Sequence, residues 1–290
     1  MPPIDVEQYQ SKLLSKLKLE PFPEPEYIPL GYPVLLCHGY GAIASMVNKK
    51  SPLYDVSMFL RSHGVRCFAP NIVPYARIDT RAKNWQQVLE HLSERTGAKK
   101  FHVIAHSMGG LDIRYGCRHL DFCNYIATLT TIATPHKGTS LADYTLETPD
   151  ILRNKITAFT DWIADYIYPN EKSDTNGALK QLATSYIRDH FNSNDNLTDR
   201  IPCFSYSAAV GKGTPQTIST LLKYQNRIVY KREGINDGFV SVNSSKWGTH
   251  RATIALSHME QIKMNISKER LPKWEEFWLD VVRTLSKETT

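Results

Sequence analysis

The sequence predicts an α/β fold in which helices flank a mostly parallel central sheet. Short apolar runs alternate with stretches of helical periodicity, as βαβ units require. The alternation stops near residue 140 and resumes near residue 200, which indicates a helical insertion at 140–200. With 290 residues, of which 41% are hydrophobic, the chain can form a single domain, 1–290, around this insertion.

The expected strands are short and apolar throughout, because a parallel sheet is covered on both faces. The chain offers such runs at 32–39 (YPVLLCHG), 65–70 (VRCFAP), 101–106 (FHVIAH), 125–133 (YIATLTTIA) and 201–210 (IPCFSYSAAV).

Four helices are expected between and after these strands. The first starts at Ser51-Pro52 and stops before Gly64, because proline suits the first helical position and glycine ends helices. The others are 80–96, which Gly97 would end, a helix directly after residue 106, and a final helix at 272–285.

The insertion at 140–200 contains a helical stripe that would start at Thr148-Pro149 and carry Ile156, Phe159, Ile163 and Ile167. A stripe of this kind is typical of an ordinary helix packed on a core. An insertion between strands is also typical of a cap over a binding site. Both readings stay open at this point.

Charge and cysteine content limit the partners. The net charge of +6 is scattered, with no basic stripe interleaved with aromatics, so nucleic acid is not an expected partner. The 5 cysteines are an odd number and three lie in expected strands, which predicts reduced core residues. We expect no transmembrane segment and, without a signal-peptide pattern, a cytoplasmic location unless the chain leaves by another route.

The segment Ala105-His106-Ser107-Met108-Gly109 carries the strongest chemical signal. An expected strand leads into it and an expected helix follows. It matches the G-x-S-x-G nucleophile elbow of α/β-hydrolases, with alanine at the first small position. Small residues are needed two places before and after the serine because the flanking backbones approach closely. The pattern predicts Ser107 as a nucleophile.

A serine hydroxyl needs a base that an acid orients, and in this fold the order is serine, acid, histidine. Asp237 lies on an Asn-Asp-Gly turn that we expect between strands. Of ten histidines, only His250 and His258 follow it. His258 comes directly after an apolar run, whereas His250 lies in a polar segment. We therefore expect Asp237 to orient His258, and His258 to act as base and then acid toward Ser107.

The oxyanion of the tetrahedral intermediate needs two backbone donors. One is expected from Met108, the residue after the nucleophile, and the other from Tyr40 in the His38-Gly39-Tyr40-Gly41 loop. His38 precedes the nucleophile, so we expect it to brace this loop rather than to act as the base. The side chain of His106 should point away from the serine.

Together these motifs resemble a known family. HGYG, AHSMGG, ATPHKGT, NDGFVSVNSS and SHMEQI occur in the order and spacing of secreted bacterial triacylglycerol lipases of the true-lipase family. The resemblance extends from about Tyr32 to Ile266. It implies the α/β-hydrolase fold, a triad of Ser107, Asp237 and His258, a helical lid within 140–200, and acyl esters as substrates. The lid would make transient contact with a lipid interface.

The resemblance also implies a calcium ion near the histidine, held by two aspartates, and a disulfide. Here one aspartate position is Glu260, and the other falls in GTPQTIST, which has no carboxylate. One carboxylate makes a poor calcium site, so we expect no metal and no other cofactor. Asn243 stands where a cysteine of the disulfide is expected.

The leading hypothesis is a lipase or carboxylesterase that acts through an acyl-serine intermediate. A thioesterase, amidase or acyltransferase would use the same triad, and the fold alone does not choose among them. A lipid-binding protein of this fold without activity is an alternative of another class.

Overall fold

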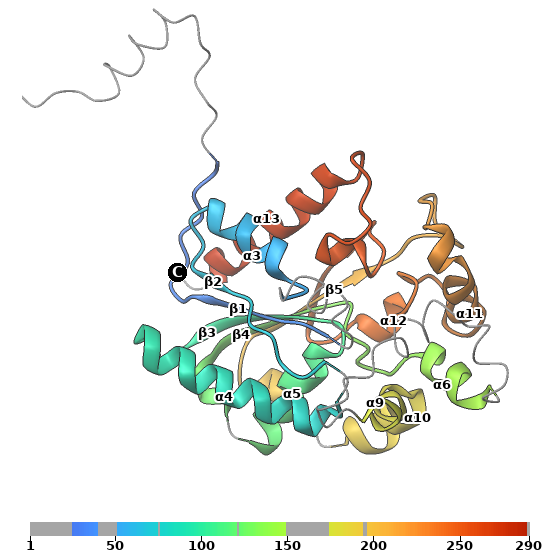
Figure 1. The fold of residues 1–290 in the computed structure, drawn as a ribbon, viewed down its shortest axis with the longest axis horizontal. Helices are drawn as coiled ribbons and strands as arrows, with labels where there is room; N and C mark the ends of the chain where they lie inside the picture. The colour runs from blue at the N-terminus through green and yellow to red at the C-terminus, as the bar shows by residue number, and fades with distance from the viewer. Residues whose placement is uncertain are drawn as a thin grey trace, which may run out of the picture.

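The computed structural model describes residues 25–39, 51–74, 76–120, 122–148, 174–193 and 196–288. Within them the chain forms a 6-stranded parallel sheet of order β2-β1-β3-β4-β5-β6 (Figure 1). The strands are β1 (Val34–Cys37), β2 (Cys67–Phe68), β3 (Phe101–His106), β4 (Ile126–Ile132), β5 (Cys203–Ala208) and β6 (Thr249–Ile254). The five expected apolar runs all contain a strand.

Helices cover both faces of the sheet. In Figure 1, α3 (Tyr54–Ser62) and α13 (Leu271–Glu288) lie on one face, and α4 (Ile78–Thr96) and α5 (Gly109–His119) lie on the other. The remaining α-helices are α6 (Ser140–Glu147), α9 (Thr175–Leu182), α10 (Thr184–Tyr186), α11 (Lys223–Glu233) and α12 (Val242–Ser245). Shorter turns are η1 (Phe122–Tyr125), η2 (Ile187–Phe191), η3 (Leu197–Asp199), η4 (Thr220–Leu222) and η5 (Glu260–Ile262).

The central strands are buried along nearly their whole length because each of their faces packs on helices. In β1, Val34 and Leu36 join the cluster that contains Trp274 of α13. Leu35 alternates with them and joins the cluster around Trp85 of α4. This period of two explains why a continuous apolar run, rather than an alternating one, marks the strand.

Glycine ends two of the expected helices. Gly97 follows α4 in the left-handed conformation with φ 70°, and Gly64 follows α3 with φ 81°. Both conformations favour glycine because it has no Cβ. The first helix begins at Tyr54 rather than at Ser51, and the Ser51 hydroxyl accepts a hydrogen bond from the Leu53 N–H at 3.3 Å.

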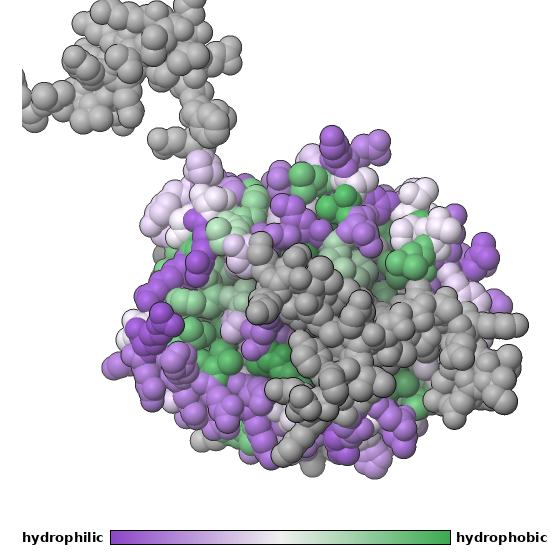
Figure 2. Space-filling model, viewed as in Figure 1, coloured by the Kyte–Doolittle hydropathy of each residue, from purple (hydrophilic) through white to green (hydrophobic). Residues whose placement is uncertain are grey.

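A third apolar cluster packs α6, α9 and α11 around Met108, which lies just after β3, and Phe239, which lies in the turn between α11 and α12. The described parts of 140–200 are helices and turns. The expected stripe of Ile156, Phe159, Ile163 and Ile167 lies outside the described residues. Figure 2 shows hydrophilic residues around the rim of the molecule and hydrophobic ones nearer the middle of that face.

The expectation that Asp237 lies between strands is wrong. Helix α11 precedes it, and a turn closed by an isolated bridge between Asn236 and Ser241 leads into α12. Phe239 and Val240 are apolar because they enter the third cluster. Conversely, β6 is a strand of polar character, whose residues alternate between exposed and half-buried because it forms the edge of the sheet.

No described helix combines the length and the apolar character that crossing a bilayer requires.

Candidate active site

Ser107 occupies a strained turn between β3 and α5. Its φ is 56°, a left-handed value that is uncommon for a residue with a side chain. The turn is tight: a Cβ on Gly109 would lie 2.7 Å from the carbonyl oxygen of Cys37. The Thr134 hydroxyl fixes the turn by donating to the Ser107 carbonyl at 2.7 Å. Gly109 thus has the role that the elbow pattern predicts for a small residue two places after the serine.

The loop after β1 lies directly against the serine. A Cβ on Gly39 would be 2.5 Å from the Ser107 Cβ and 3.0 Å from the Met108 nitrogen. Any side chain at this position would collide with the elbow. The loop that the sequence predicts as the oxyanion loop therefore starts beside Ser107.

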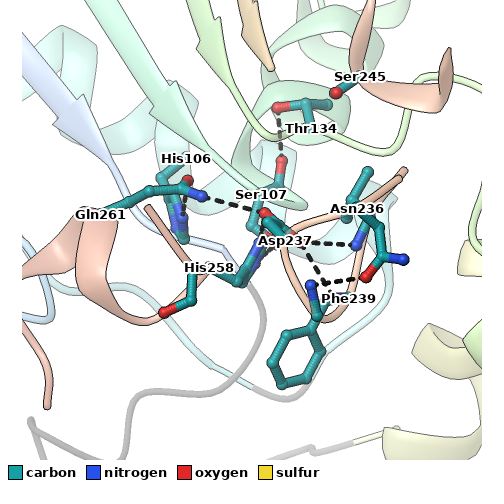
Figure 3. A network of polar contacts seen from close by, with 12 residues as sticks. His106, Ser107, Thr134, Asn236, Asp237, Phe239, Ser245, His258 and Gln261 are labelled. Atoms are coloured by element: carbon teal, nitrogen blue, oxygen red, sulfur yellow. Dashed lines mark hydrogen bonds and ion pairs between the residues drawn. The ribbon is translucent and has the colours of Figure 1, made fainter. Parts of the chain in front are cut away.

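The structure brings together the three residues that the sequence predicts as a triad (Figure 3). His258 Nε2 is 2.9 Å from Ser107 Oγ, and His258 Nδ1 is 2.7 Å from Asp237 Oδ2. An ionised carboxylate only accepts, so Nδ1 carries the proton and Nε2 is free to accept from the serine hydroxyl. All three side chains are buried. His250 lies elsewhere, on β6 beside Ser205.

Hydrogen bonds hold the Asp237 carboxylate on both oxygens. Oδ1 accepts from the backbone N–H groups of Phe239 at 3.0 Å and Val240 at 2.9 Å. Oδ2 accepts from His258 and from Gln261 Nε2 at 3.0 Å. The backbone N–H of His258 also donates to the Asp237 carbonyl. Donors to both oxygens therefore fix the orientation of this buried carboxylate toward His258.

Gln261 and His106 support the triad, and sequence reasoning missed both roles. The ring of His106 lies 4.6 Å from that of His258, and its Nε2 lies 3.0 Å from Gln261 Oε1. Gln261 therefore bridges His106 and Asp237 (Figure 3). Burial and the neighbouring His258 hold the pKa of His106 well below its usual value, so His106 stays a neutral donor. The one feature of the sequence that could have predicted this support is a glutamine one helical turn after His258.

The Met108 N–H, one of the two expected oxyanion donors, lies at the start of α5 next to Gly39. No described residue accepts a hydrogen bond from it. Tyr40, the other expected donor, lies outside the described residues.

His38 braces the loop, as expected. Its Nε2 accepts from the Ile72 N–H at 3.2 Å, so its Nδ1 donates to the Gly39 carbonyl at 3.0 Å. Burial and the Arg81 cation lower the pKa of His38 to about 3. A histidine that stays neutral under these conditions keeps both hydrogen bonds.

A buried ion pair lies beneath this loop and was also missed. Arg81 of α4 contacts Asp112 of α5 at 2.9 Å, and neither side chain is exposed. Arg81 also donates to the carbonyl of His38 at 2.7 Å. Burial raises the pKa of Asp112 to about 6, although Arg81 and Trp85 act in the opposite direction. The feature of the sequence that could have predicted this pair is an arginine on the apolar stripe of the helix, one turn before Trp85.

The residues where the resemblance implies calcium do not fit that ion. Both oxygens of Glu260 accept from Arg270 Nη1, at 3.0 and 2.8 Å. The Thr217 carbonyl accepts from Arg270 Nη2. A guanidinium therefore faces the oxygens that a cation would use. Among the described residues, no group of three or more His, Cys, Asp or Glu side chains could hold a metal ion.

A hydrogen bond stands at the position where the resemblance implies a disulfide. All five cysteines are buried thiols outside any disulfide, and three of them lie in strands as expected. Asn243, at the expected cysteine position, instead accepts a hydrogen bond from Lys137 Nζ at 2.9 Å.

The fold and the site define the class. A parallel sheet carries a serine on a strand-to-helix turn, and an aspartate and a histidine reach it from loops later in the chain. This is the α/β-hydrolase fold.

Sequence comparison points to triacylglycerol lipases. The chain is 31% identical over 231 residues to triacylglycerol lipase 2 of Saccharomyces cerevisiae, covering 77% of this chain and 65% of that protein. It is 28% identical over 172 residues to a triacylglycerol lipase of Pseudarthrobacter phenanthrenivorans, covering 55% of this chain and 52% of that protein. The chain thus spans between half and two thirds of these relatives. No family model matches it.

Solved structures share the fold. A metagenomic carboxyl esterase aligns with a TM-score of 0.71 at 18% identity, over 93% of this chain and 80% of that one. Lipase 1 of Pelosinus fermentans aligns with a TM-score of 0.62 at 18% identity, over 88% of this chain and 99% of that one.

Proposed function

We propose that this chain is a carboxylic ester hydrolase of the lipase or carboxylesterase type. The observation that carries the proposal is the hydrogen-bonded series from Ser107 through His258 to Asp237 on a nucleophile elbow. The names of its sequence relatives, triacylglycerol lipases, support acyl esters as the substrate class.

In the proposed reaction, Ser107 Oγ attacks the ester carbonyl while His258 Nε2 takes its proton. Asp237 keeps the imidazole in the required tautomer and stabilises the imidazolium that forms. His258 then protonates the leaving alkoxide, which leaves an acyl-serine. Water, deprotonated by His258, hydrolyses this intermediate and restores the serine.

The negative charge on the tetrahedral oxygen needs donors that are already in place. We propose the backbone N–H groups of Met108 and Tyr40 for this role. The Met108 N–H is at the positive end of α5, which favours an anion there. Gly39 makes room for the substrate carbonyl because it presents no side chain toward Ser107.

An apolar environment beside the triad supports an acyl group as the substrate. Met108 follows Ser107, Phe239 follows the Asp237 turn, and Met259 follows His258, and all three pack in the third cluster. The Phe239 ring lies 5.0 Å from the His258 ring. Burying hydrocarbon there would be favourable by roughly 0.8 kcal/mol per methylene.

We propose further that segment 140–200 acts as a lid that meets a lipid interface. Leu141 and Leu179, in described helices of this segment, pack in the same apolar cluster as Met108. A lid predicts a rise in activity when a substrate of limited solubility passes from monomers to droplets. Activity that follows ordinary saturation through that point would contradict a lid.

The substrate class is tested with matched acyl donors. Purified protein is assayed on p-nitrophenyl esters of increasing chain length and on the corresponding thioesters and anilides. We expect the esters to be turned over fastest. A clear preference for thioesters or anilides would replace the ester proposal with a thioesterase or amidase.

A fluorophosphonate probe tests whether the site is active at all. We expect labelling of Ser107, located by peptide mapping, in the wild type and none in Ser107→Ala. Absence of labelling in folded wild-type protein would favour a lipid-binding protein without activity.

A further inference from the structure

The segment that bears His258 is closed by two reciprocal hydrogen bonds. The Ser257 N–H donates to Glu260 Oε2 at 2.7 Å, and the Glu260 N–H lies 3.4 Å from the Ser257 hydroxyl oxygen. This reciprocal pair has the pattern of a capping box, S-x-x-E, and it closes the turn that leads into η5, which begins at Glu260. Because His258 lies between the two partners, the position of Glu260 helps to fix the backbone of the histidine.

Arg270 fixes Glu260 in turn. Its Nη1 donates to both carboxylate oxygens, and its Nη2 donates to the carbonyl of Thr217. The side chains of Arg270 and Glu260 are only 17% and 10% exposed, so water screens the pair weakly. One guanidinium therefore joins the histidine loop, the loop around Thr217 and the start of α13.

Helix α13, which begins directly after Arg270, also holds this loop. The indole N–H groups of Trp274 and Trp278 both donate to the carbonyl of Gln261, each at 3.0 Å. Both tryptophans are fully buried, so this end of the helix is a rigid support. The Gln261 side chain in turn donates a hydrogen bond to the Asp237 carboxylate, so fixing Gln261 also helps to fix Asp237.

The single carboxylate of Glu260 is better matched by the one positive charge of a guanidinium than by a divalent ion. A calcium site needs several oxygen ligands, usually with more than one carboxylate. Of the two carboxylate positions that the resemblance implies for this ion, only one is filled, by Glu260, because 213–220 (GTPQTIST) contains no Asp or Glu. A guanidinium neutralises one carboxylate and spans its two oxygens through fixed donors, which a lysine ammonium does less well.

We propose that Arg270 is a positioning residue that takes the place of a divalent cation, and that it keeps His258 aligned with Ser107 without a metal. This proposal rests on the proposed hydrolase function. Arg270 acts through Glu260 and Ser257 and does not reach the reacting atoms.

The test compares Arg270→Ala with Lys273→Ala, a matched loss of charge at an exposed position of α13. We expect Arg270→Ala to lower kcat on a p-nitrophenyl ester by roughly 10- to 100-fold, the effect of a misplaced base, with KM nearly unchanged. Lys273→Ala should stay within about twofold of the wild type. A kcat of Arg270→Ala equal to that of Lys273→Ala would overturn the proposal.

Rescue experiments separate positioning from a general loss of structure. Added guanidinium ion, kept well below denaturing concentrations, should restore part of the activity of Arg270→Ala, and Arg270→Lys should retain an intermediate kcat. The pair should also be coupled, so that Glu260→Gln adds little to Arg270→Ala. Additive losses would overturn the link through Glu260.

The wild type should keep its activity in a chelator and gain none from calcium. A large loss in chelator that calcium restores would overturn the proposal, since a metal would then hold the loop.

A spectroscopic readout keeps this inference distinct from the hydrolase proposal. The proton on His258 Nδ1, shared with Asp237, should give a far-downfield NMR resonance in the wild type and in Lys273→Ala. We expect it to broaden or shift in Arg270→Ala, even if no substrate is ever turned over. An unchanged resonance in Arg270→Ala would overturn the positioning role while leaving the hydrolase proposal in place.

Discussion

At the residue scale, Ser107 illustrates how a strained conformation persists. A left-handed residue with a side chain costs of the order of 1–3 kcal/mol, which its surroundings must offset. Here the Ser107 N–H donates to the Ile132 carbonyl at 2.9 Å, and the Thr134 hydroxyl binds the Ser107 carbonyl. Both polar groups of the turn are therefore satisfied, and its strain aims the hydroxyl at His258.

Removing a triad side chain should abolish turnover without unfolding the protein. We expect Ser107→Ala and His258→Ala each to lower kcat by at least about 10⁴-fold, because the serine loses its nucleophilic oxygen or its base. Initial rates on a p-nitrophenyl ester, with circular dichroism as the check on folding, measure this. His250→Ala is the control and should stay active. Loss of activity in His250→Ala together with an active His258→Ala would refute the assignment of the base.

The contact of Gly39 with the elbow gives a second prediction at this scale. In Gly39→Ala the new methyl group would have to displace Ser107 or the loop, so kcat should fall on the order of 10²-fold. Gly97→Ala is a useful comparison because a Cβ there meets nothing within 4 Å. That variant should lose about 1 kcal/mol of stability from its positive φ and keep its kcat. Equal kinetics for the two variants would contradict the steric argument.

At the scale of elements, the buried pair of Arg81 and Asp112 joins α4 and α5 to the loops after β1 and β2. Besides the His38 carbonyl, Arg81 Nη1 donates to the carbonyls of Val73 at 2.9 Å and Pro74 at 3.0 Å. These carbonyls belong to loops with no regular partner strand. One arginine thus satisfies one buried and two partly buried carbonyl acceptors where the chain leaves the sheet.

Breaking this pair should be costly. Arg81→Met leaves the Asp112 charge buried without its partner, so the free energy of unfolding should drop by about 3–5 kcal/mol. Arg77→Met is the control, because Arg77 pairs with Asp79 at 3.2 Å with the two side chains 50% and 34% exposed. Exposed pairs contribute about 1 kcal/mol or less. Urea denaturation of both variants measures the difference, and similar losses would contradict the prediction.

Local patterns account for what the sequence could predict. The strand from Phe101 to His106 and the end of α4 at Gly97 are set by neighbouring residues, and both were predicted to the residue. The edge strand β6 was not, because its pairing with β5 depends on partners far away in sequence. The triad residues could be chosen from chain order. Gln261 and Arg270 could not, because their roles depend on contacts that appear only after folding.

At the scale of the whole molecule, three apolar clusters enclose a set of neutral histidines. Burial lowers the pKa of His38 to about 3 and holds those of His106 and His136 well below the usual range. Arg114 donates to His136 Nδ1 at 2.9 Å, which further disfavours the imidazolium. In mild acid the unfolded chain would therefore bind protons on these three histidines that the folded protein does not bind.

Acid should consequently destabilise the protein before most carboxylates titrate. Below about pH 6.5 the unfolded chain protonates these histidines and the folded chain does not, so stability falls with pH by up to about 1.4 kcal/mol per pH unit for each. Asp112 opposes this, because its pKa is raised to about 6 and the folded state takes up its proton first. Urea denaturation between pH 7 and pH 4, roughly the window between these pKa values, measures the net slope. His136→Gln should give a shallower slope, and an unchanged slope would refute the assignment.

The burial of every thiol has a practical consequence. A thiol reacts as its thiolate, and burial raises the pKa of Cys67 to about 12 and that of Cys37 well above its usual value. The Cys117 pKa is raised as well, by its hydrogen bond to Cys123 and by burial. Alkylating reagents will therefore find no ready target on the folded protein. A single cysteine introduced on the surface can carry a fluorescent or spin label without removal of the native ones.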